Sequence, residues 1–182
     1  LLHPNFLDIV RELKEKKVFI TVLSNGTLIT EQIINGLIDA GFSDGDVFQI
    51  SFDAADEKTY CLQRGVNLFE KAQMGITQLR NANLCTELHV VPTKLNINKI
   101  YDIVKLAEEL QCNYLSGAPL APFFQESKNL ECSSEQLFQV SKAVESQARD
   151  YHLKYLGGIE GEKCANEKWL ETLVKNKTYK SG

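Results

Sequence analysis

The stretch VFQISFDAADEKTY, residues 47–60, decides how the chain folds. Its first six residues are apolar enough to form a buried strand, yet the run ends in Ser51 and Asp53 and opens at once into a polar helix start. The same change occurs upstream, where VFITVL runs into SNGT, and downstream, where LHVV runs into PTKLN. Three apolar runs that each deliver hydrogen-bonding side chains at the carboxyl end predict a site assembled from strand ends.

Apolar patterns on both sides of this stretch predict alternating strands and helices. Runs of β-branched residues without strict polar alternation indicate strands covered on both faces, as in parallel sheets. We expect four such strands, at residues 18–23, 47–52, 86–91 and 112–115. The order predicts an α/β fold of parallel βα repeats, belonging to a βα barrel or a doubly wound sheet.

Helices with one apolar face are predicted between these strands. Thr30 is the expected cap of the second helix, and Asn67 with Glu70 resembles a capping box for the third. Asn96 or Asn98 is the expected cap of the fourth helix.

The composition places the chain among ordinary globular proteins. Its 182 residues suffice for one domain with a full core. A formal net charge of −4 gives no electrostatic case for a nucleic-acid partner or an anionic membrane surface. No apolar run approaches the roughly 18 residues of a membrane span, and no secretory leader is visible. We therefore expect neither nucleic acid nor membrane among the partners.

The cysteines and histidines do not form a recognisable metal motif. The five cysteines are scattered without a CxxC pair, which indicates reduced thiols and a cytoplasmic location. The three histidines have no mutual spacing typical of a metal site. No metal ligand is predicted in the chain.

The two ends of the chain differ from its repeating middle. The chain starts with LLHPNF, without a methionine, and enters a helix that has no preceding strand to cross over from. We therefore expect at least one strand before Leu1 and interpret the chain as an internal fragment. Residues 125–182 are predicted to be a helical extension, in which Ser133 or Ser134 caps a long helix, LGGIEGEK forms a turn and NEKWLETLVKN forms a last helix.

The candidate site residues all follow predicted strands. Ligands of parallel βα folds collect at the carboxyl ends of the strands. The polar side chains expected there are Ser24, Asn25, Thr27, Ser51, Asp53, Thr93, Lys94, Asn96 and Ser116. Hydroxyls, amides and one carboxylate suit a ligand with ribose, amino and carboxylate groups. They do not form a nucleophile–base pair, because no histidine is placed to act as a general base for Ser24 or Ser51.

Each candidate also has a purely structural interpretation. SNGT is good turn chemistry, and Asp53 or Asn96 could simply cap a helix. Lys94 could be a solvated loop residue, and Arg64 either a surface residue or an anion-binding fork. His89, inside an apolar strand, is either a satisfied core histidine or a base. The functional interpretation is favoured because all the polar clusters fall at the same end of the predicted sheet.

The order LLHPNF … VLSNGT … ISFDAAD … RGVNLFEKA … VVPTKLNINKI … AEELQC resembles the middle of a radical S-adenosylmethionine (radical SAM) enzyme. It is most similar in character to the branch of peptide maturases, quinone-cofactor maturation proteins and heme-modifying enzymes. The resemblance covers roughly residues 1–124, and it implies that these residues are part of a partial (βα)6 TIM-like barrel that lacks its first strands. The individual motifs are short, but their order and spacing are specific.

The resemblance also implies which parts lie outside the chain. In this family a CxxxCxxC loop holds a [4Fe–4S] cluster, and a GGEP motif that holds the amino group of S-adenosylmethionine precedes a segment like LLHPNF. None of the five cysteines has the CxxxCxxC spacing. The cluster ligands are therefore expected outside this chain, and the chain alone is expected to be inactive.

The resemblance assigns roles to the strand-end residues. It implies that Ser51 bonds the ribose or methionine part of S-adenosylmethionine and that Arg64 pairs with the methionine carboxylate. Asp53 and Lys94 are expected on the substrate side. The remaining expected cofactor contacts are Ser24, Asn25, Thr93, Asn96 and Leu120, the last within the strand whose backbone meets adenine.

The implied activity is reductive cleavage of S-adenosylmethionine and abstraction of hydrogen from a peptide or small cofactor precursor. An electron donor such as flavodoxin or ferredoxin is the expected protein partner. Two other functions remain open on the residues alone. One is a conventional doubly wound α/β enzyme that binds a nucleotide-like ligand, and the other is a non-catalytic βα binding module.

Overall fold

The computed structural model describes residues 1–122, 124–151 and 153–161. Five parallel strands form one sheet in the order β1-β2-β3-β4-β5, which is also their order along the chain. The strands are β1 (Thr21–Ser24), β2 (Val47–Ser51), β3 (Cys85–Val90), β4 (Tyr114–Gly117) and β5 (Lys154–Tyr155). The prediction of an α/β fold built from parallel βα repeats is confirmed.

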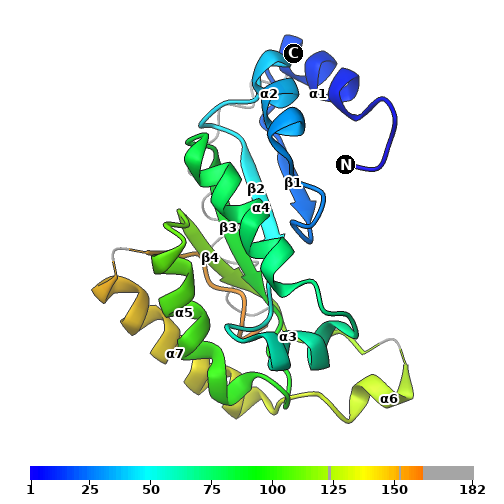
Figure 1. Cartoon of the computed structure of the whole chain (residues 1–182). Helices are drawn as coiled ribbons and strands as arrows, with labels where there is room; N and C mark the ends of the chain where they lie inside the picture. The colour runs from blue at the N-terminus through cyan, green and yellow to red at the C-terminus, as the bar shows by residue number, and fades with distance from the viewer. Residues whose placement is uncertain (123, 152, 162–182) are drawn as a thin grey trace, which may run out of the picture.

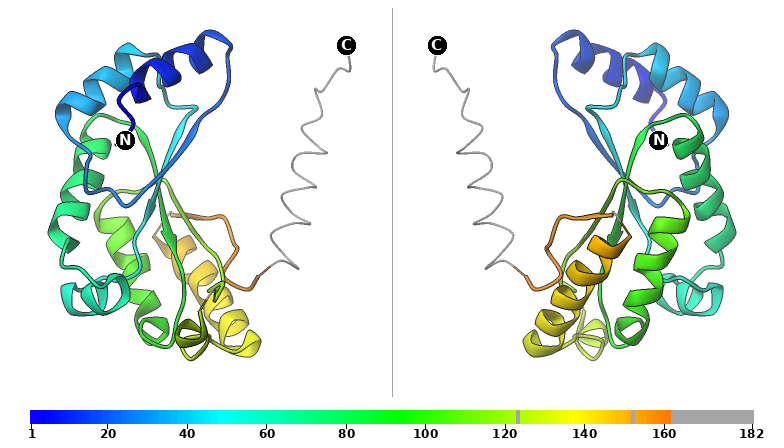
Figure 2. Two further views of the ribbon diagram at one scale, coloured as in Figure 1. Left: turned by 90° about the vertical axis from the view of Figure 1, so that its right-hand side faces the viewer. Right: turned by 90° about the vertical axis from the view of Figure 1, so that its left-hand side faces the viewer.

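Helices connect successive strands. They are α1 (Phe6–Glu15), α2 (Glu31–Asp39), α3 (Glu57–Arg64), α4 (Phe69–Asn81), the short 3₁₀ helix η1 (Ile97–Lys99), α5 (Ile100–Glu109), α6 (Gln125–Lys128) and α7 (Ser134–Asp150). Figure 2 shows that the long helices lie along one face of a strongly twisted sheet and leave the other face free of described helices. Within the described ranges, no helix combines the length and the hydrophobicity that crossing a bilayer requires.

The two faces of the sheet differ in burial on β1 and β2, which corrects the prediction of strands covered on both faces for these two strands, whereas every residue of β3 except the half-buried His89 is buried. Phe48 and Ile50 of β2 are fully buried on the helical side, whereas Gln49 and Ser51 point to the opposite side and are only half-buried. On β1, Leu23 shares that opposite side and is 70% exposed. The apolar core therefore lies between sheet and helices, and no helix of the described ranges covers the opposite, concave face.

The strand ends differ from the prediction by a few residues. The first strand begins at Thr21 rather than residue 18, because Val18 and Phe19 are exposed and lie before the sheet. The fourth strand runs to Gly117 instead of ending at residue 115. In both cases the apolar pattern located the strand correctly, but it did not predict which residues form the hydrogen bonds at the strand ends.

Two of the four predicted helix caps are confirmed and two are wrong, since Lys99 rather than Asn96 or Asn98 occupies the cap position of α5. The Thr30 side chain accepts a bond from Ile33 N, and Ser133 forms a capping box with Gln136. Asn67 does not cap α4, because its amide bonds the Glu57 carboxylate of α3 instead. The structure thereby ties α3 to the start of α4.

The strand β5 was not foreseen by the sequence analysis. It pairs in parallel with β4, and Leu156 N donates to Leu115 O just beyond it. The long helix α7 therefore serves as a crossover within the same sheet. The division after residue 124 stays a prediction, and the predicted last helix, NEKWLETLVKN, lies outside the described residues.

A buried carboxylate holds the first two βα units together. Asp46 is fully buried; its Oδ1 accepts bonds from Lys14 Nζ and Ile20 N, both at 2.8 Å, and its Oδ2 accepts from Ser43 N at 2.9 Å. Burial tends to raise the pKa of Asp46, but the bonds from Lys14, Ser43 and Ile20 outweigh it and lower the pKa. The ionised form is therefore the one that the fold stabilises.

We predict that Asp46→Asn lowers the free energy of unfolding by about 2–4 kcal/mol, because it removes a buried charge pair and leaves donors unsatisfied. Since the folded pKa is lowered, this contribution is present above the ordinary carboxyl pKa and is lost as the pH falls through the folded value. Urea denaturation at several pH values measures both effects. The exposed neighbour Asp44→Asn is the control, and equal losses in the two variants would contradict the prediction.

Candidate functional site

The carboxyl ends of the strands meet at one edge of the sheet. In Figure 1 the strands run toward the end of the molecule where α3 and α6 lie. The register pairs Ser51 with His89 and His89 with Ser116 across β2, β3 and β4. Polar side chains from separate βα units are therefore neighbours at this edge.

Asp53 and Arg64 form a largely buried ion pair at this edge. Arg64 Nη2 lies 2.5 Å from Asp53 Oδ2, and Asp53 Oδ1 accepts a bond from Val91 N at 2.8 Å. Burial raises the pKa of Asp53, against the lowering effects of Arg64 and the Val91 amide. Arg64 Nε is buried and has no hydrogen-bond partner among the described residues, while 27% of the side chain is exposed. The guanidinium therefore keeps donors for a further acceptor.

The helix that carries Arg64 is fixed at its other end. Asp56, rather than Asp53, caps α3 by accepting a bond from Thr59 N. Lys99 Nζ donates to Asp56 Oδ2 at 2.8 Å, and this bond is the main cause that lowers the pKa of Asp56 to about 2. The helix α3 is thus bound to the start of α5, and Gly65 ends it in the left-handed region at φ 73°.

Asn96 and Thr93 brace the loops that follow β2 and β3. The fully buried Asn96 amide donates to Asp53 O at 2.9 Å and to Val91 O at 3.0 Å, and its Oδ1 accepts from Thr93 N at 2.7 Å. It does not cap the following helix with its side chain. Thr93 Oγ1 donates to Gln63 Oε1 at 2.8 Å. Gln63, next to Arg64 on α3, was missed by the sequence analysis because a single glutamine before an arginine carries no distinctive pattern.

The loop after β1 is shaped by a very close backbone contact. Ser24 Oγ accepts from Gly26 N, and Asn25 Oδ1 accepts from the Thr27 amide and hydroxyl. Gly26 adopts φ 79°. A Cβ placed on Gly75 of α4 would lie only 2.2 Å from Gly26 O. Helix α4 can press against the SNGT loop only because position 75 lacks a side chain.

Two further predicted residues lie on the β4 side of the edge. Lys94 is exposed, and its Nζ donates to Asn129 O while its N donates to Leu130 O, so it joins its loop to the segment between α6 and α7. Leu120 is half-buried beside a hollow of about 190 Å³ that Pro92, Pro119 and Leu137 also line. Neither of these contacts involves Arg64 or Asp53.

The concave face carries a hydrogen-bonded row that the strand-end analysis did not include. Gln49 Nε2 donates to Glu87 Oε1 at 2.8 Å, Ser116 Oγ donates to the same oxygen, and His89 Nδ1 lies 2.7 Å from Ser116 Oγ. An alternating pattern in the sequence could have indicated this row. Gln49 and Ser51 alternate with buried apolar residues, and so do Glu87 and His89. His89 is therefore not a core histidine of the helical side.

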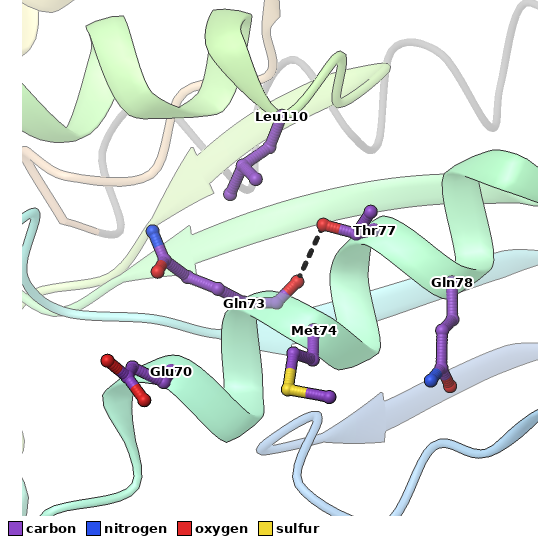
Figure 3. A pocket seen from close by; sticks show the side chains of 6 residues that line it. All are labelled: Glu70, Gln73, Met74, Thr77, Gln78 and Leu110. Carbon is purple, nitrogen blue, oxygen red and sulfur yellow. Dashed lines mark hydrogen bonds between the residues drawn. The ribbon is translucent and has the colours of Figure 1, made fainter.

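A larger hollow lies elsewhere. It encloses about 540 Å³ between α4 and the end of α5, and Figure 3 shows that Glu70, Gln73, Met74, Thr77 and Gln78 reach it from α4 while Leu110 reaches it from the other side. These residues belong to the outer, helical surface. The hollow therefore does not coincide with the strand-end residues.

The comparison with protein families decides the assignment. The model of the Radical SAM superfamily matches residues 1–107, which is more than half of the chain. The chain belongs to the radical SAM superfamily. Members of this superfamily are generally enzymes.

Similar proteins agree with this assignment. An AdoMet-dependent heme synthase from Methanosarcina barkeri (strain Fusaro / DSM 804) is 30% identical over 111 residues, which are 60% of this chain and 31% of that protein. SuiB of Streptococcus suis, solved bound to S-adenosylmethionine, matches with a TM-score of 0.73 and 16% identity over 99% of this chain and 40% of its own. anSMEcpe, solved with AdoMet and a Kp18Cys peptide, matches with a TM-score of 0.68 and 17% identity over 85% of this chain and 46% of its own.

These structural matches confirm the predicted fold of a radical SAM partial barrel. The chain spans less than half the length of each of these relatives. Among the described residues, no group of three or more histidine, cysteine or acidic side chains is arranged to hold a metal ion.

We predict that Gly75→Ala destabilises the fold by about 2 kcal/mol or more, because the new methyl group meets a backbone oxygen that cannot move without the SNGT loop. The matched control is Gly36→Ala in α2, where the added Cβ would approach only the flexible Leu7 side chain. Both changes favour the helical state equally. Thermal unfolding compares the two variants, and similar melting temperatures would contradict the prediction.

Proposed function

We propose that this chain is the S-adenosylmethionine-binding core of an enzyme that cleaves S-adenosylmethionine reductively and removes hydrogen from a peptide or cofactor-precursor substrate. The observation that carries the proposal is the strand-end Arg64, which Asp53 holds while donors of its guanidinium remain unused. A planar guanidinium with spare donors fits a carboxylate, which is the terminal group of the methionine part.

The other strand-end residues fit the rest of the same cofactor. We assign Ser51 to the ribose or methionine part and Thr93 and Asn96 to the ribose side, where Asn96 acts by shaping the loop because its amide is already bonded. The SNGT loop, with Ser24 and Asn25, would line the cofactor site on the side of β1. Leu120 would lie against the adenine, beside the small hollow at the end of β4.

Asp53 takes a different role from the one expected from the resemblance. Both of its carboxylate oxygens are engaged, one by Val91 N and the other by Arg64. We therefore propose that Asp53 positions Arg64 and does not contact substrate. Lys94, which is exposed and bonded to Asn129 O, remains a candidate for the substrate side through its position at the rim.

When bound together with a reduced [4Fe–4S] cluster, S-adenosylmethionine supplies a 5′-deoxyadenosyl radical that takes hydrogen from the substrate. We propose that the cluster ligands lie outside this chain, because no cysteine here has the CxxxCxxC spacing. A flavodoxin or ferredoxin would supply the electron. A peptide substrate is supported by the likeness to SuiB, which was also solved with the precursor peptide SuiA, and to anSMEcpe.

We predict that Arg64→Lys weakens S-adenosylmethionine binding at least tenfold, about 1.4 kcal/mol, because lysine keeps the charge beside Asp53 but lacks the planar fork. Isothermal titration calorimetry on the complete gene product measures the Kd. Lysine is chosen because Arg64→Ala would leave the buried Asp53 charge unpaired and endanger the fold.

The control for this prediction is Arg11→Lys. Arg11 pairs with Asp8 on the exposed surface of α1, so its replacement should leave the Kd within twofold. An unchanged Kd in Arg64→Lys, with circular dichroism showing an intact fold, would remove the main support for the proposed function.

A further inference from the structure

Four polar side chains form a connected row on the concave face of the sheet. Gln49 of β2, Glu87 and His89 of β3, and Ser116 of β4 are linked in the order Gln49–Glu87–Ser116–His89. Glu87 and Ser116 are buried, whereas His89 is half-buried. The row thus has a buried anchor at Glu87 and ends at the more exposed imidazole.

The chemistry of the row fixes the direction of its hydrogen bonds. Glu87 Oε1 accepts from both Gln49 Nε2 and the Ser116 hydroxyl. Since the single proton of the Ser116 hydroxyl is used in that bond, its oxygen must accept from His89 Nδ1. A neutral His89 then carries its proton on Nδ1 and keeps the lone pair on Nε2.

The position of His89 places its imidazole on the concave side of the sheet. His89 is paired in register with Ser51 on one side and Ser116 on the other, so it lies at the last paired position of β2 and one position before the end of the β3–β4 pairing. The helical side of the sheet is filled by residues such as Leu88 and Val90, which are fully buried. The imidazole therefore stands on the concave face, directly beside the residue assigned to the cofactor.

Burial, against the combined effect of the nearby carboxylates, favours the neutral form of His89. Burial lowers the pKa of His89 and is the largest influence on it. Glu87 and Asp53 act to raise this pKa, and Arg64 acts to lower it. The net lowering means that the imidazole accepts a hydrogen bond at neutral pH instead of repelling or donating to its surroundings.

We propose that His89 contacts the substrate, its Nε2 accepting a hydrogen bond from an N–H or O–H group close to the carbon that reacts. Ser116 and Glu87 act as positioning residues that fix the ring and its tautomer. This inference rests on the proposed function, because it places substrate on the concave face beside the bound cofactor. The preferred substrate therefore bears a neutral donor, such as a peptide amide or a hydroxyl.

Nuclear magnetic resonance of the ¹⁵N-labelled complete gene product without its cluster tests the orientation of the row. Long-range ¹H–¹⁵N correlations are expected to show His89 as the neutral Nδ1–H tautomer, with a pKa below that of an ordinary histidine. Its signal is assigned by its loss in His89→Asn. Ser116→Ala should abolish the preference for this tautomer. An Nε2–H tautomer in the unaltered protein would overturn the proposal.

Chemical modification tests whether the lone pair is presented to the open face. Diethyl pyrocarbonate acylates unprotonated imidazole nitrogen, and peptide mapping by mass spectrometry reports each histidine separately. We expect His89 to be acylated at neutral pH, with His3, which is exposed, as the internal reference. Acylation of His3 without any acylation of His89 would overturn the proposal.

Two variants separate substrate contact from cofactor binding. His89→Asn can keep a donor to Ser116 but places nothing at Nε2, whereas His89→Gln can return a polar atom there. Both should leave the Kd for S-adenosylmethionine within twofold, while a tenfold weaker Kd in His89→Asn would assign His89 to the cofactor and overturn the proposal.

With a peptide that raises 5′-deoxyadenosine formation above the substrate-free rate, the KM should rise at least tenfold in His89→Asn and less in His89→Gln. An equal KM in the unaltered protein and His89→Asn also overturns it, whereas failure of the proposed function appears separately, as an unchanged Kd in Arg64→Lys.

Discussion

The buried carboxylate of Asp53 joins three parts of the chain that are far apart in sequence. Its side chain bonds Val91 N after β3 and Arg64 at the end of α3, while its backbone oxygen accepts from Asn96. Removing the carboxylate would leave the Val91 amide and the Arg64 guanidinium without this acceptor, and a buried donor without a partner costs about 1–3 kcal/mol. The geometry of the strand-end edge therefore depends on one acidic side chain that is itself almost inaccessible.

The division of the sheet into two faces follows from how its residues alternate. On the helical face, Phe48, Ile50 and Leu88 supply the apolar area whose burial stabilises the domain. On the concave face, the intervening positions carry Gln49 and Glu87, which would be costly to bury without partners and instead bond each other. A single two-residue period thus produces both the core and a polar surface suited to a ligand.

Much of the fold could be predicted from the sequence because the decisive signals are local. The apolar runs located β2 and β3 to within a residue, and the hydroxyls of Thr30 and Ser133 marked helix starts. The strand β5 could not be found, because it contains only two residues and exists through its pairing with β4. Local pattern also misassigned Asn67, whose amide bonds a neighbouring helix instead of its own.

The sequence predicted that the candidate residues lie at one edge of the sheet, but not which contacts hold them in place. Parallel strands necessarily bring Ser51, Asp53 and Thr93 to one edge, so their proximity followed from the fold class. The bonds that Asp53 receives from Val91 N and from the Asn96 amide could not be read in the same way, since they join residues 38 and 43 positions apart. Whether a strand-end carboxylate faces a ligand or braces an arginine depends on three-dimensional contacts alone.

The pairing of Asp53 with Arg64 also bears on selectivity for the ligand. Because Asp53 already offsets the guanidinium charge, an incoming carboxylate gains less from net charge than from the geometry of the remaining N–H donors. In the proposed function such a site would discriminate by shape, since an anion that cannot meet the planar fork would compete with Asp53 without replacing its bonds. Because Arg64 Nε is itself buried, the ligand carboxylate would meet the guanidinium through the exposed 27% of the side chain.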